Sequence, residues 1–237
     1  MAFATKTDPF AIVGEAGLLE CTAVTDNKSS SVAEAHDAKG TLIAHEVYGE
    51  QIAPSADYKV KKSGSIEGVK LGNVTEYDGK RVVLSHIHLH TGAGDEMTLT
   101  ASGEQVEDST DGTCPAKYTL PNIIVSVCRH AKALFNAFAV GGEGCHLQTA
   151  DYDFACAVGK ATVSGVLIAH GVYEAYGEAQ VTIIQTGSVN PTLSVPQNSS
   201  WFVSAPLTKT NPDEDYPTWS ATLRLHLAMD AEELSGS

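Results

Sequence analysis

Hydrophobic and polar residues alternate along several stretches of the chain, with the period of two that is typical of β-strands. The clearest case is residues 80–90. Its two faces would carry Val83, Ser85, Ile87 and Leu89, and Val82, Leu84, His86, His88 and His90. Residues 219–229 alternate in the same way, and shorter strands are predicted at 18–24, 53–61, 97–102 and 118–125. The pattern predicts a protein built mainly from strands, with a polar loop over residues 27–39.

A nine-residue motif occurs twice in the chain. Gly40–Tyr48 returns as Gly165–Tyr173, with seven identical positions at an offset of 125 residues. Such a repeat indicates two copies of one unit. Weaker matches extend the alignment on both sides, and they leave residues 66–96 of the first copy without a counterpart.

The extra residues 66–96 predict a β-hairpin that turns at Asp78 and Gly79. Asp-Gly between two alternating stretches favours a type I′ turn, because both central residues of that turn need a positive φ. Since this hairpin has no counterpart in the second copy, we expect it to project from the shared core and to pair with a neighbouring subunit.

One helix is predicted, over residues 126–142. Ser126 is a suitable N-cap, and Gly141-Gly142 would end the helix. Apolar residues recur on one helical face, and they are Val127, Ala131, Leu134, Phe135 and Phe138. We expect this helix to connect the two copies and to pack against a sheet.

Together these features predict an all-β fold with one helix: a duplicated antiparallel β-barrel or β-sandwich with a projecting hairpin. The expected order is an N-terminal arm (1–16), a first β-unit (17–125) with the hairpin insertion (66–96), a connecting helix (126–142), a second β-unit (143–230) and a flexible tail (231–237).

Composition narrows the possible partners. The chain has 237 residues and a net charge of −14, and the acidic residues are spread over both copies. Proteins that bind the nucleic-acid backbone need a basic surface, so specific DNA binding is not expected. No apolar run is long enough for a transmembrane helix, so we expect no membrane partner. The five cysteines show no CxxC spacing, which predicts free thiols in a reducing compartment.

Candidate chemistry is confined to His86, His88 and His90. Three imidazoles on one strand face could bind zinc or nickel if another ligand, such as His45, His146 or Asp95, lay close by. Exposed strand histidines are the commoner case, so we assign no metal site and no cofactor, and keep a metal-dependent hydrolase as an alternative. The chain has no GxSxG, no GxGxxG after a strand and no P-loop, so we assign no catalytic residue and do not expect an enzyme.

The repeated motif carries two polar aromatic pairs, His45 with His170 and Tyr48 with Tyr173. A residue kept in both copies of a diverged repeat is more often required by the fold than by a single site. We therefore interpret these four residues as the structural centre of the repeat.

The overall layout resembles the tail tube proteins of tailed bacteriophages, which are structural proteins of the virion. The resemblance rests on an N-terminal arm, a β-barrel, a long hairpin, one helix against a sheet and an acidic composition. It implies stacked rings locked together by hairpin and arm, around an acidic lumen through which DNA passes without specific binding. It also implies assembly in the host cytoplasm and contacts with other virion proteins.

A duplicated subunit would supply two ring positions, so the expected homo-oligomer is a trimer with pseudo-six-fold symmetry or a hexamer. The acidic loops Glu104–Asp111 and Asp213–Asp215 are candidates for lining the lumen. A further alternative is a carbohydrate-binding or adhesin module, in which exposed aromatic residues would bind sugar. The candidates for that role are Tyr77, Tyr152, Trp201 and Trp219.

Overall fold

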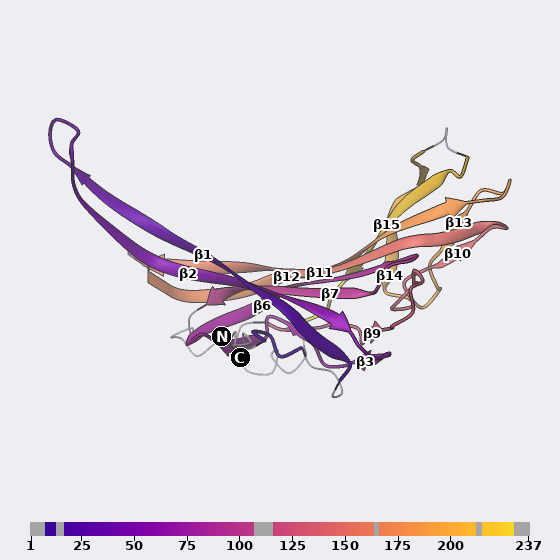
Figure 1. Cartoon of the computed structure of the whole chain (residues 1–237), viewed down its shortest axis with the longest axis horizontal. Coiled ribbons are helices and arrows are strands. Elements are labelled where there is room, and N and C mark those ends of the chain that lie inside the picture. Colours follow the sequence, from indigo (N-terminus) through magenta and orange to yellow (C-terminus); the bar gives the residue numbers. More distant parts are fainter. Residues whose placement is uncertain (1–7, 13–16, 107–115, 164–165, 212–214, 230–237) are drawn as a thin grey trace, which may run out of the picture.

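The computed structural model describes residues 8–12, 17–106, 116–163, 166–211 and 215–229, and within these ranges every regular element is a β-strand (Figure 1). None of these ranges contains a helix with the length and apolar character that a membrane span needs. The all-β part of the predicted fold is therefore correct.

Nine strands form one antiparallel sheet, with the order β1-β2-β7-β6-β11-β12-β15-β14 and with β5 paired to β6 beside this path. In that order the strands are β1 (Leu19–His36), β2 (Leu42–Val60), β7 (Thr98–Val106), β6 (Lys80–Gly92), β11 (Cys145–Val163), β12 (Val166–Gln185), β15 (Thr218–His226) and β14 (Trp201–Lys209), and β5 is Val74–Tyr77. The sheet is open, with β1 and β14 at its two edges, so the expected closed barrel is not present in the described residues.

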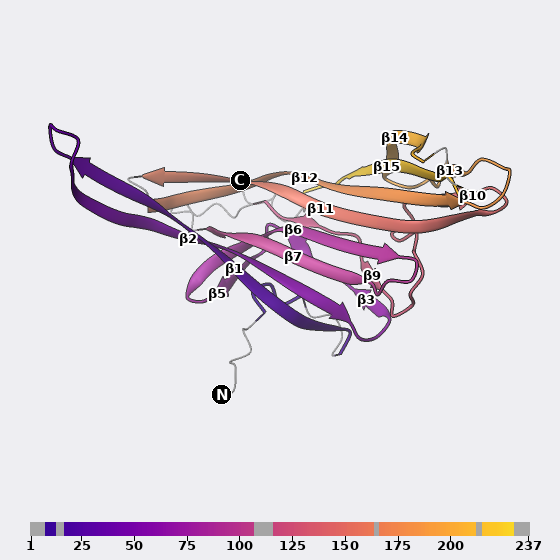
Figure 2. The same cartoon turned by 45° about the horizontal axis from the view of Figure 1, so that its top comes forward.

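Three two-stranded sheets complete the fold. They are β3 (Gly64–Ile66) with β9 (Ile123–Val125), β4 (Lys70–Leu71) with β8 (Tyr118–Thr119), and β10 (Ala139–Gly141) with β13 (Thr192–Ser194). Figures 1 and 2 both place β3 and β9 below the main sheet, and β10 and β13 at one end of the molecule. The buried residues of the first two pairs belong to the hydrophobic core, and they are Ile66, Leu71, Tyr118, Ile123 and Val125. We call the face of the main sheet on this side the covered face, and the opposite one the uncovered face.

The main sheet divides into two four-stranded groups with the same strand order. We name β1-β2-β7-β6 the first sheet unit and β11-β12-β15-β14 the second. In each unit the chain makes a long hairpin, and the fourth strand in sequence lies between that hairpin and the third. The units meet where β6 pairs with β11, over seven residue pairs from Thr149–Gly92 to Ala155–His86. We call this pairing the central joint.

The two long hairpins, β1–β2 and β11–β12, have matching registers. Adding 126 to a β1 residue number and 125 to its β2 partner converts the first pairing into the second, so that Leu19–Val60 becomes Cys145–Gln185. The register shifts obey the same rule: those at Cys21/Ala23, Ser29/Ser31 and Ala35/His36 become Leu147/Thr149, Ala155/Ala157 and Ala161/Thr162. A bulge is a specific local irregularity, and three at equivalent places are a strong correspondence.

The correspondence continues through the other strands of the units. In the first unit Asp57 of β2 pairs with Thr100 of β7. Adding 125 to the β2 number, as above, and 120 to the β7 number gives Thr182 and Ser220, which pair in the second unit. Likewise Leu84–Gly103 becomes Val203–Leu223, with 119 added on β6. β6 in the first unit therefore occupies the place of β14 in the second. The predicted insertion over residues 66–96 assigned β6 no counterpart, whereas the registers relate β6 to β14.

The predicted turn at Asp78 and Gly79 forms, with φ angles of 52° and 68°, and it joins β5 to β6. The hairpin does not project, however. β6 lies inside the main sheet, and its Val82 and Val83 are fully buried in the core. The element that extends beyond the sheet is the β1–β2 hairpin (Figure 1), and residues 27–36, which were expected to be a loop, belong to its first strand.

The helix predicted over residues 126–142 is absent. The segment is irregular up to β10, and Phe135 and Asn136 have φ angles of 58° and 50°, which end any helical turn there. The Tyr152 hydroxyl accepts a hydrogen bond from the Leu134 amide (2.7 Å) and donates one to the Lys132 carbonyl (2.8 Å). A side chain of the sheet thus satisfies backbone groups that a helix would have paired internally.

Part of the predicted apolar stripe packs on the sheet, whereas its first residue, Val127, is 53% exposed. Leu134 and Phe138 are buried, and the Phe135 ring meets those of Tyr152 and Phe154 edge to face, with centroids 5.2 Å apart in both pairs. The described part of the expected N-terminal arm is also fixed in the core: Phe10 and Ile12 are buried, and Asp8 accepts a hydrogen bond from the Tyr58 hydroxyl (2.5 Å).

Candidate assembly site at the sheet edges

The central joint is a complete example of how one sheet unit joins another. β11 pairs with β6 over residues 149–155, and this window lies between the two register shifts around Gln148 and Cys156. On the covered face Ile87 lies opposite Phe154 and Leu89 opposite Tyr152, and all four side chains are fully buried. Backbone pairing and apolar burial therefore act together, and the bulges limit the register in which they can do so.

The other face of the joint carries the three predicted histidines and two carboxylates from β11. His86 Nε2 lies 3.0 Å and His88 Nδ1 2.9 Å from the same oxygen, Asp153 Oδ1. His90 Nδ1 lies 2.6 Å from Asp151 Oδ1. We call these five residues the His–Asp ladder.

The ladder couples proton binding to the pairing of the two strands. The hydrogen bond to Asp153 raises the pKa of His88 against the opposing effect of burial. Burial opposes ionisation of Asp153, but the hydrogen bonds from His86 and His88 outweigh it and hold the pKa of Asp153 well below its usual range. These shifts favour ion pairs across the joint.

The geometry gives no support to the metal-hydrolase alternative. Each histidine has a ring nitrogen directed to an aspartate, and His90 Nε2 is 3.7 Å from the exposed Asp95. Across the described part of the chain, no group of three or more His, Cys, Asp or Glu side chains is arranged to hold a metal ion.

The outer edges of the main sheet present the counterparts of the joined strands. β1 corresponds to β11, and residues 23–29 of β1 lie between register shifts equivalent to those that bound the joint on β11. β14 corresponds to β6. In the described ranges, no strand pairs with the outer side of β1 or of β14. One edge of the main sheet is thus formed by β1, the counterpart of β11, and the other edge is formed by β14, the counterpart of β6.

An ion pair lies beyond the end of the joint. Lys160, in the outer part of β11, lies 2.7 Å from Glu104 of β7 in the first sheet unit. A pocket of about 410 Å³ lies beside this contact, with Lys160 and Glu104 in its wall together with Ser29, Gln51 and Ser102. The β11–β12 hairpin therefore contacts the first unit beyond the paired strands.

The residues taken as the centre of the repeat lie away from the joint. The backbones of His45 and Tyr48 pair with β1, and their side chains fall outside the described set. His170 is partly buried, and Tyr173 keeps 49% of its surface exposed. The repeat therefore lies in the outer half of each long hairpin, where Val172 is buried and Tyr173 is half-exposed.

The aromatic residues proposed as a sugar platform are not exposed. Tyr77, Tyr152 and Trp201 are buried, and the Trp219 indole donates a hydrogen bond to the Gln185 side chain (2.9 Å). This set cannot present a stacking surface, so the structure does not support the carbohydrate-binding alternative.

Two other sets of predicted residues are only partly described. The thiols of Cys21, Cys128, Cys145 and Cys156 are free, and Cys114 lies outside the described residues. Of the acidic loops, Glu104 belongs to β7 and Asp215 is exposed, whereas residues 107–111 and 213–214 also lie outside.

Sequence reasoning found the histidines but missed their partners. Asp151 and Asp153 alternate on β11 as the histidines do on β6. Residues directly opposite each other on paired strands share a face, so alternating histidines on one strand and alternating aspartates on another predict that the two strands pair. The edge strands could not be identified in this way, since an edge depends on the strand order.

No protein-family model matches the chain, and no curated protein matches it either.

Proposed function

We propose that this chain is a structural subunit that assembles with copies of itself into a closed ring, as tail tube subunits of bacteriophage virions do. One observation carries the proposal: the two free edges, β1 and β14, correspond to the two strands that pair in the central joint, β11 and β6. An edge strand has unpaired N–H and C=O groups that can pair with another chain. Here a suitable partner is the opposite edge of an identical molecule.

The proposal treats the chain as two diverged copies of one four-stranded unit. It is supported by the constant numbering offsets between the units, by their equivalent bulges and by the Gly40–Tyr48 and Gly165–Tyr173 repeat. On this interpretation the central joint repeats between molecules, with β14 of one copy beside β1 of the next.

Such a contact is heterologous, because it joins two different surfaces. Heterologous contacts generate a ring when the rotation per subunit closes, and a filament when it does not. Two equivalent units per chain give three subunits a pseudo-six-fold arrangement, and six subunits a twelve-unit ring. The trimer and the hexamer are thus the two candidate assemblies.

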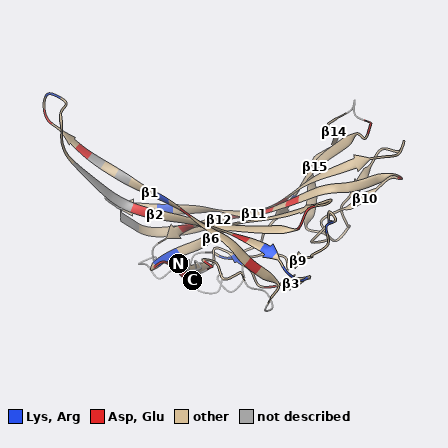
Figure 3. Cartoon of the chain, viewed as in Figure 1, with Lys and Arg blue, Asp and Glu red and all other residues tan. Residues whose placement is uncertain are grey.

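The uncovered face of the main sheet supports the further proposal that DNA passes without binding. Its charged residues include Glu20, Asp57, Glu104, Asp151, Asp153 and Glu178 against Lys59, Lys160 and Arg224. Figure 3 shows acidic positions spread along the strands without a continuous basic stripe. Carboxylates on the inner face of a ring would repel DNA phosphates. We propose other virion proteins as further partners, and the virion, after assembly in the host cytoplasm, as the location.

Mass measurement and imaging test the proposal. The purified chain should form a discrete trimer or hexamer by native mass spectrometry, and rings by negative-stain electron microscopy. A chain that stays monomeric at high concentration would contradict it. Rings that retain duplex DNA on a phosphate-binding inner surface would contradict the DNA-passage part alone.

A further inference from the structure

We propose that the β1–β2 hairpin of a second copy occupies the β14 edge in the register of the central joint, with its Glu34 paired to Arg224. This inference rests on the proposed ring, and it specifies which residues of the two copies meet. It uses three observations: the correspondence of registers, a charge pair with exchanged signs, and an apolar patch at the β14 edge.

The register comes directly from the central joint. There His88 lies opposite Asp153 and Leu89 opposite Tyr152. The offsets between the units convert the β6 residues into Thr208 and Lys209 (88 and 89 plus 120), and the β11 residues into Asn27 and Asp26 (153 and 152 minus 126).

The inferred contact therefore places Thr208 of one copy opposite Asn27 of the next, and Lys209 opposite Asp26. The second pair brings opposite charges together across neighbouring strands, an arrangement that stabilises strand pairing. β14 also has a register shift between Ala205 and Thr208, with Pro206 inside it. A bulge at a fixed place and a residue without an N–H restrict the registers that an incoming strand can adopt.

The ion pair beyond the central joint has a counterpart with its charges exchanged. By the same offsets, Glu104 corresponds to Arg224 (104 plus 120) and Lys160 corresponds to Glu34 (160 minus 126). Lys160–Glu104 inside the molecule thus becomes Glu34–Arg224 between molecules. The charge at each position is reversed between the two units, and each pair still combines one cation with one carboxylate.

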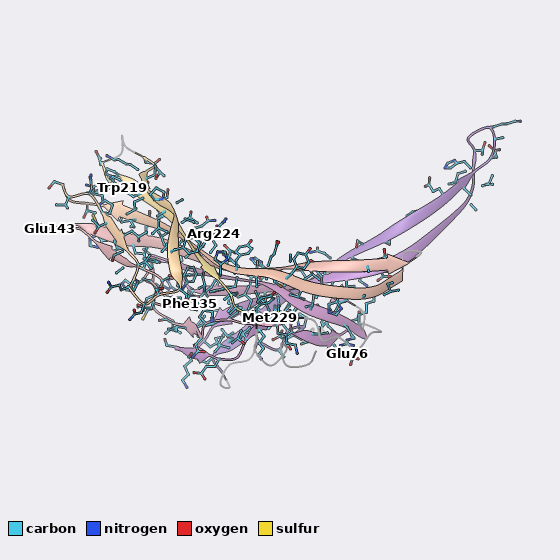
Figure 4. The ribbon with its side chains drawn as sticks, turned by 180° about the vertical axis from the view of Figure 1, so that it is seen from behind. Glu76, Phe135, Glu143, Trp219, Arg224 and Met229 are labelled. Carbon is cyan, nitrogen blue, oxygen red and sulfur yellow. The ribbon has the colours of Figure 1, made fainter. Side chains whose placement is uncertain are left out.

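Arg224 and Glu34 are both accessible for this contact. Arg224 is exposed, and Figure 4 shows it on the opposite side of the sheet from Phe135. Its Nε donates to Glu178 Oε2 (2.9 Å), and a guanidinium has five N–H groups, so others are available for a second carboxylate. Glu34 is exposed on β1, where His36 lies 3.3 Å from it.

Apolar side chains are exposed around Arg224, whereas the corresponding residues of the first sheet unit are buried. Phe202 and Val203 of β14 are each 42% exposed, whereas their counterparts in β6, Val83 and Leu84 (202 and 203 minus 119), are 0% and 4% exposed, at the end of the joint where β5 pairs with β6. A pocket of about 430 Å³ lies next to them, lined by Glu174, Ala175, Tyr176, Arg224, Leu225 and His226. Exposed apolar patches of this kind mark interaction surfaces, and the incoming hairpin would cover this one.

Charge reversal tests the ion pair. Arg224→Glu places a third carboxylate beside those of Glu34 and Glu178 at each contact, and Glu34→Arg places two cations there. Each single variant should raise the protein concentration needed for ring formation by about tenfold or more, since like charges across an interface are strongly unfavourable. The double variant should restore assembly, because it exchanges the charges as Lys160–Glu104 does. Lys160→Glu is the matched control, which should assemble at the unmodified concentration.

Cysteine cross-linking tests the register independently. Asn27→Cys combined with Thr208→Cys should give covalent oligomers on mild oxidation, since directly opposite strand residues have a spacing that a disulfide can span. Glu20→Cys with Thr208→Cys is the out-of-register control and should give none above the background of the natural thiols.

The outcomes separate this inference from the proposed ring. Rings that form equally well in both charge variants, or that cross-link equally through both cysteine pairs, would overturn the inference and leave the ring intact. An unmodified chain that forms no oligomer would overturn both.

Discussion

His88 of β6 and Asp153 of β11 face each other across the central joint, with Nδ1 and Oδ1 2.9 Å apart. The contact links the two sheet units through a histidine whose pKa is raised and a carboxylate whose pKa is lowered. Stability at this joint should therefore depend on pH, and the direction of that dependence follows from the two shifts.

The raised pKa of His88 contributes stability that is complete below the unfolded value of about 6.5 and is lost as pH rises through the higher folded value. The lowered pKa of Asp153 contributes stability that is present above about pH 4 and is lost as pH falls. We expect the free energy of unfolding to be largest between about pH 4 and 6.5 and to fall on either side.

Asp153→Asn should flatten this pH profile and cost about 1 kcal/mol near pH 6, a value reduced for the partial exposure of the pair. Urea unfolding at several pH values measures the effect. Asp57→Asn, on an exposed part of β2, is the control and should keep the unmodified profile. A profile of Asp153→Asn that matches the unmodified protein would contradict the role of the pair.

Tyr152→Phe should destabilise the protein by about 1–3 kcal/mol without changing its assembly. The substitution leaves the Leu134 amide and the Lys132 carbonyl without their hydrogen-bond partner next to a buried ring. Thermal unfolding measures the loss. Tyr176→Phe removes a hydroxyl from a more exposed tyrosine and should change stability by less than about 0.5 kcal/mol. Equal losses in the two variants would show that the hydroxyl contacts are not the cause.

Gly79→Ala should cost about 1 kcal/mol, because the turn holds this residue at a φ of 68°. No atom would obstruct the added methyl group, so the loss is conformational. Gly79→Asn should cost less, since asparagine tolerates the left-handed region better than alanine. Chemical denaturation of the two variants decides the matter, and a smaller loss for alanine than for asparagine would refute the explanation.

Cys156 should react with thiol reagents far more slowly than Cys128. Burial, followed by the charge of Glu104, raises the pKa of Cys156 to about 11, so only about one molecule in a thousand would carry the thiolate at pH 8. Cys128 is exposed. Timed alkylation followed by peptide mass spectrometry gives both rates. Comparable rates at pH 8 would mean that Cys156 is not shielded as the structure indicates.

Shortening the β1–β2 hairpin should leave the monomer folded. Residues 34–44 have exposed side chains, and Asn-Gly in place of residues 34–45 would join the directly paired residues Ala33 and Glu46 by a two-residue turn. Circular dichroism should show an unchanged thermal midpoint, while ring formation should need a higher protein concentration, because the shortened hairpin lacks Glu34 but keeps residues 23–29. Deleting residues 73–83 instead should unfold the protein, because that segment includes the buried Val82 and Val83. A folded deletion variant would contradict the central position of β6.

The sequence by itself determined the features that depend on neighbouring residues. Alternation along residues 80–90 identified β6, because strand side chains point to opposite faces whatever the strand pairs with. Asp78 and Gly79 specified their turn, since only a few residues accept positive φ at both positions. The repeat at Gly40 and Gly165 is also visible in neighbouring residues, and the two related units that it predicts remain part of the proposed function.

Only the tertiary structure decided the features that depend on distant residues. The stripe from Val127 to Phe138 has helical spacing, yet the Tyr152 hydroxyl and the aromatic rings of β11 hold that segment in an irregular path. Residues 27–36 are polar because they belong to an exposed edge strand, and polarity alone does not distinguish such a strand from a loop. Which strands are edges depends on the order in which they pair, and that order is set by contacts such as His88–Asp153 between residues 65 positions apart.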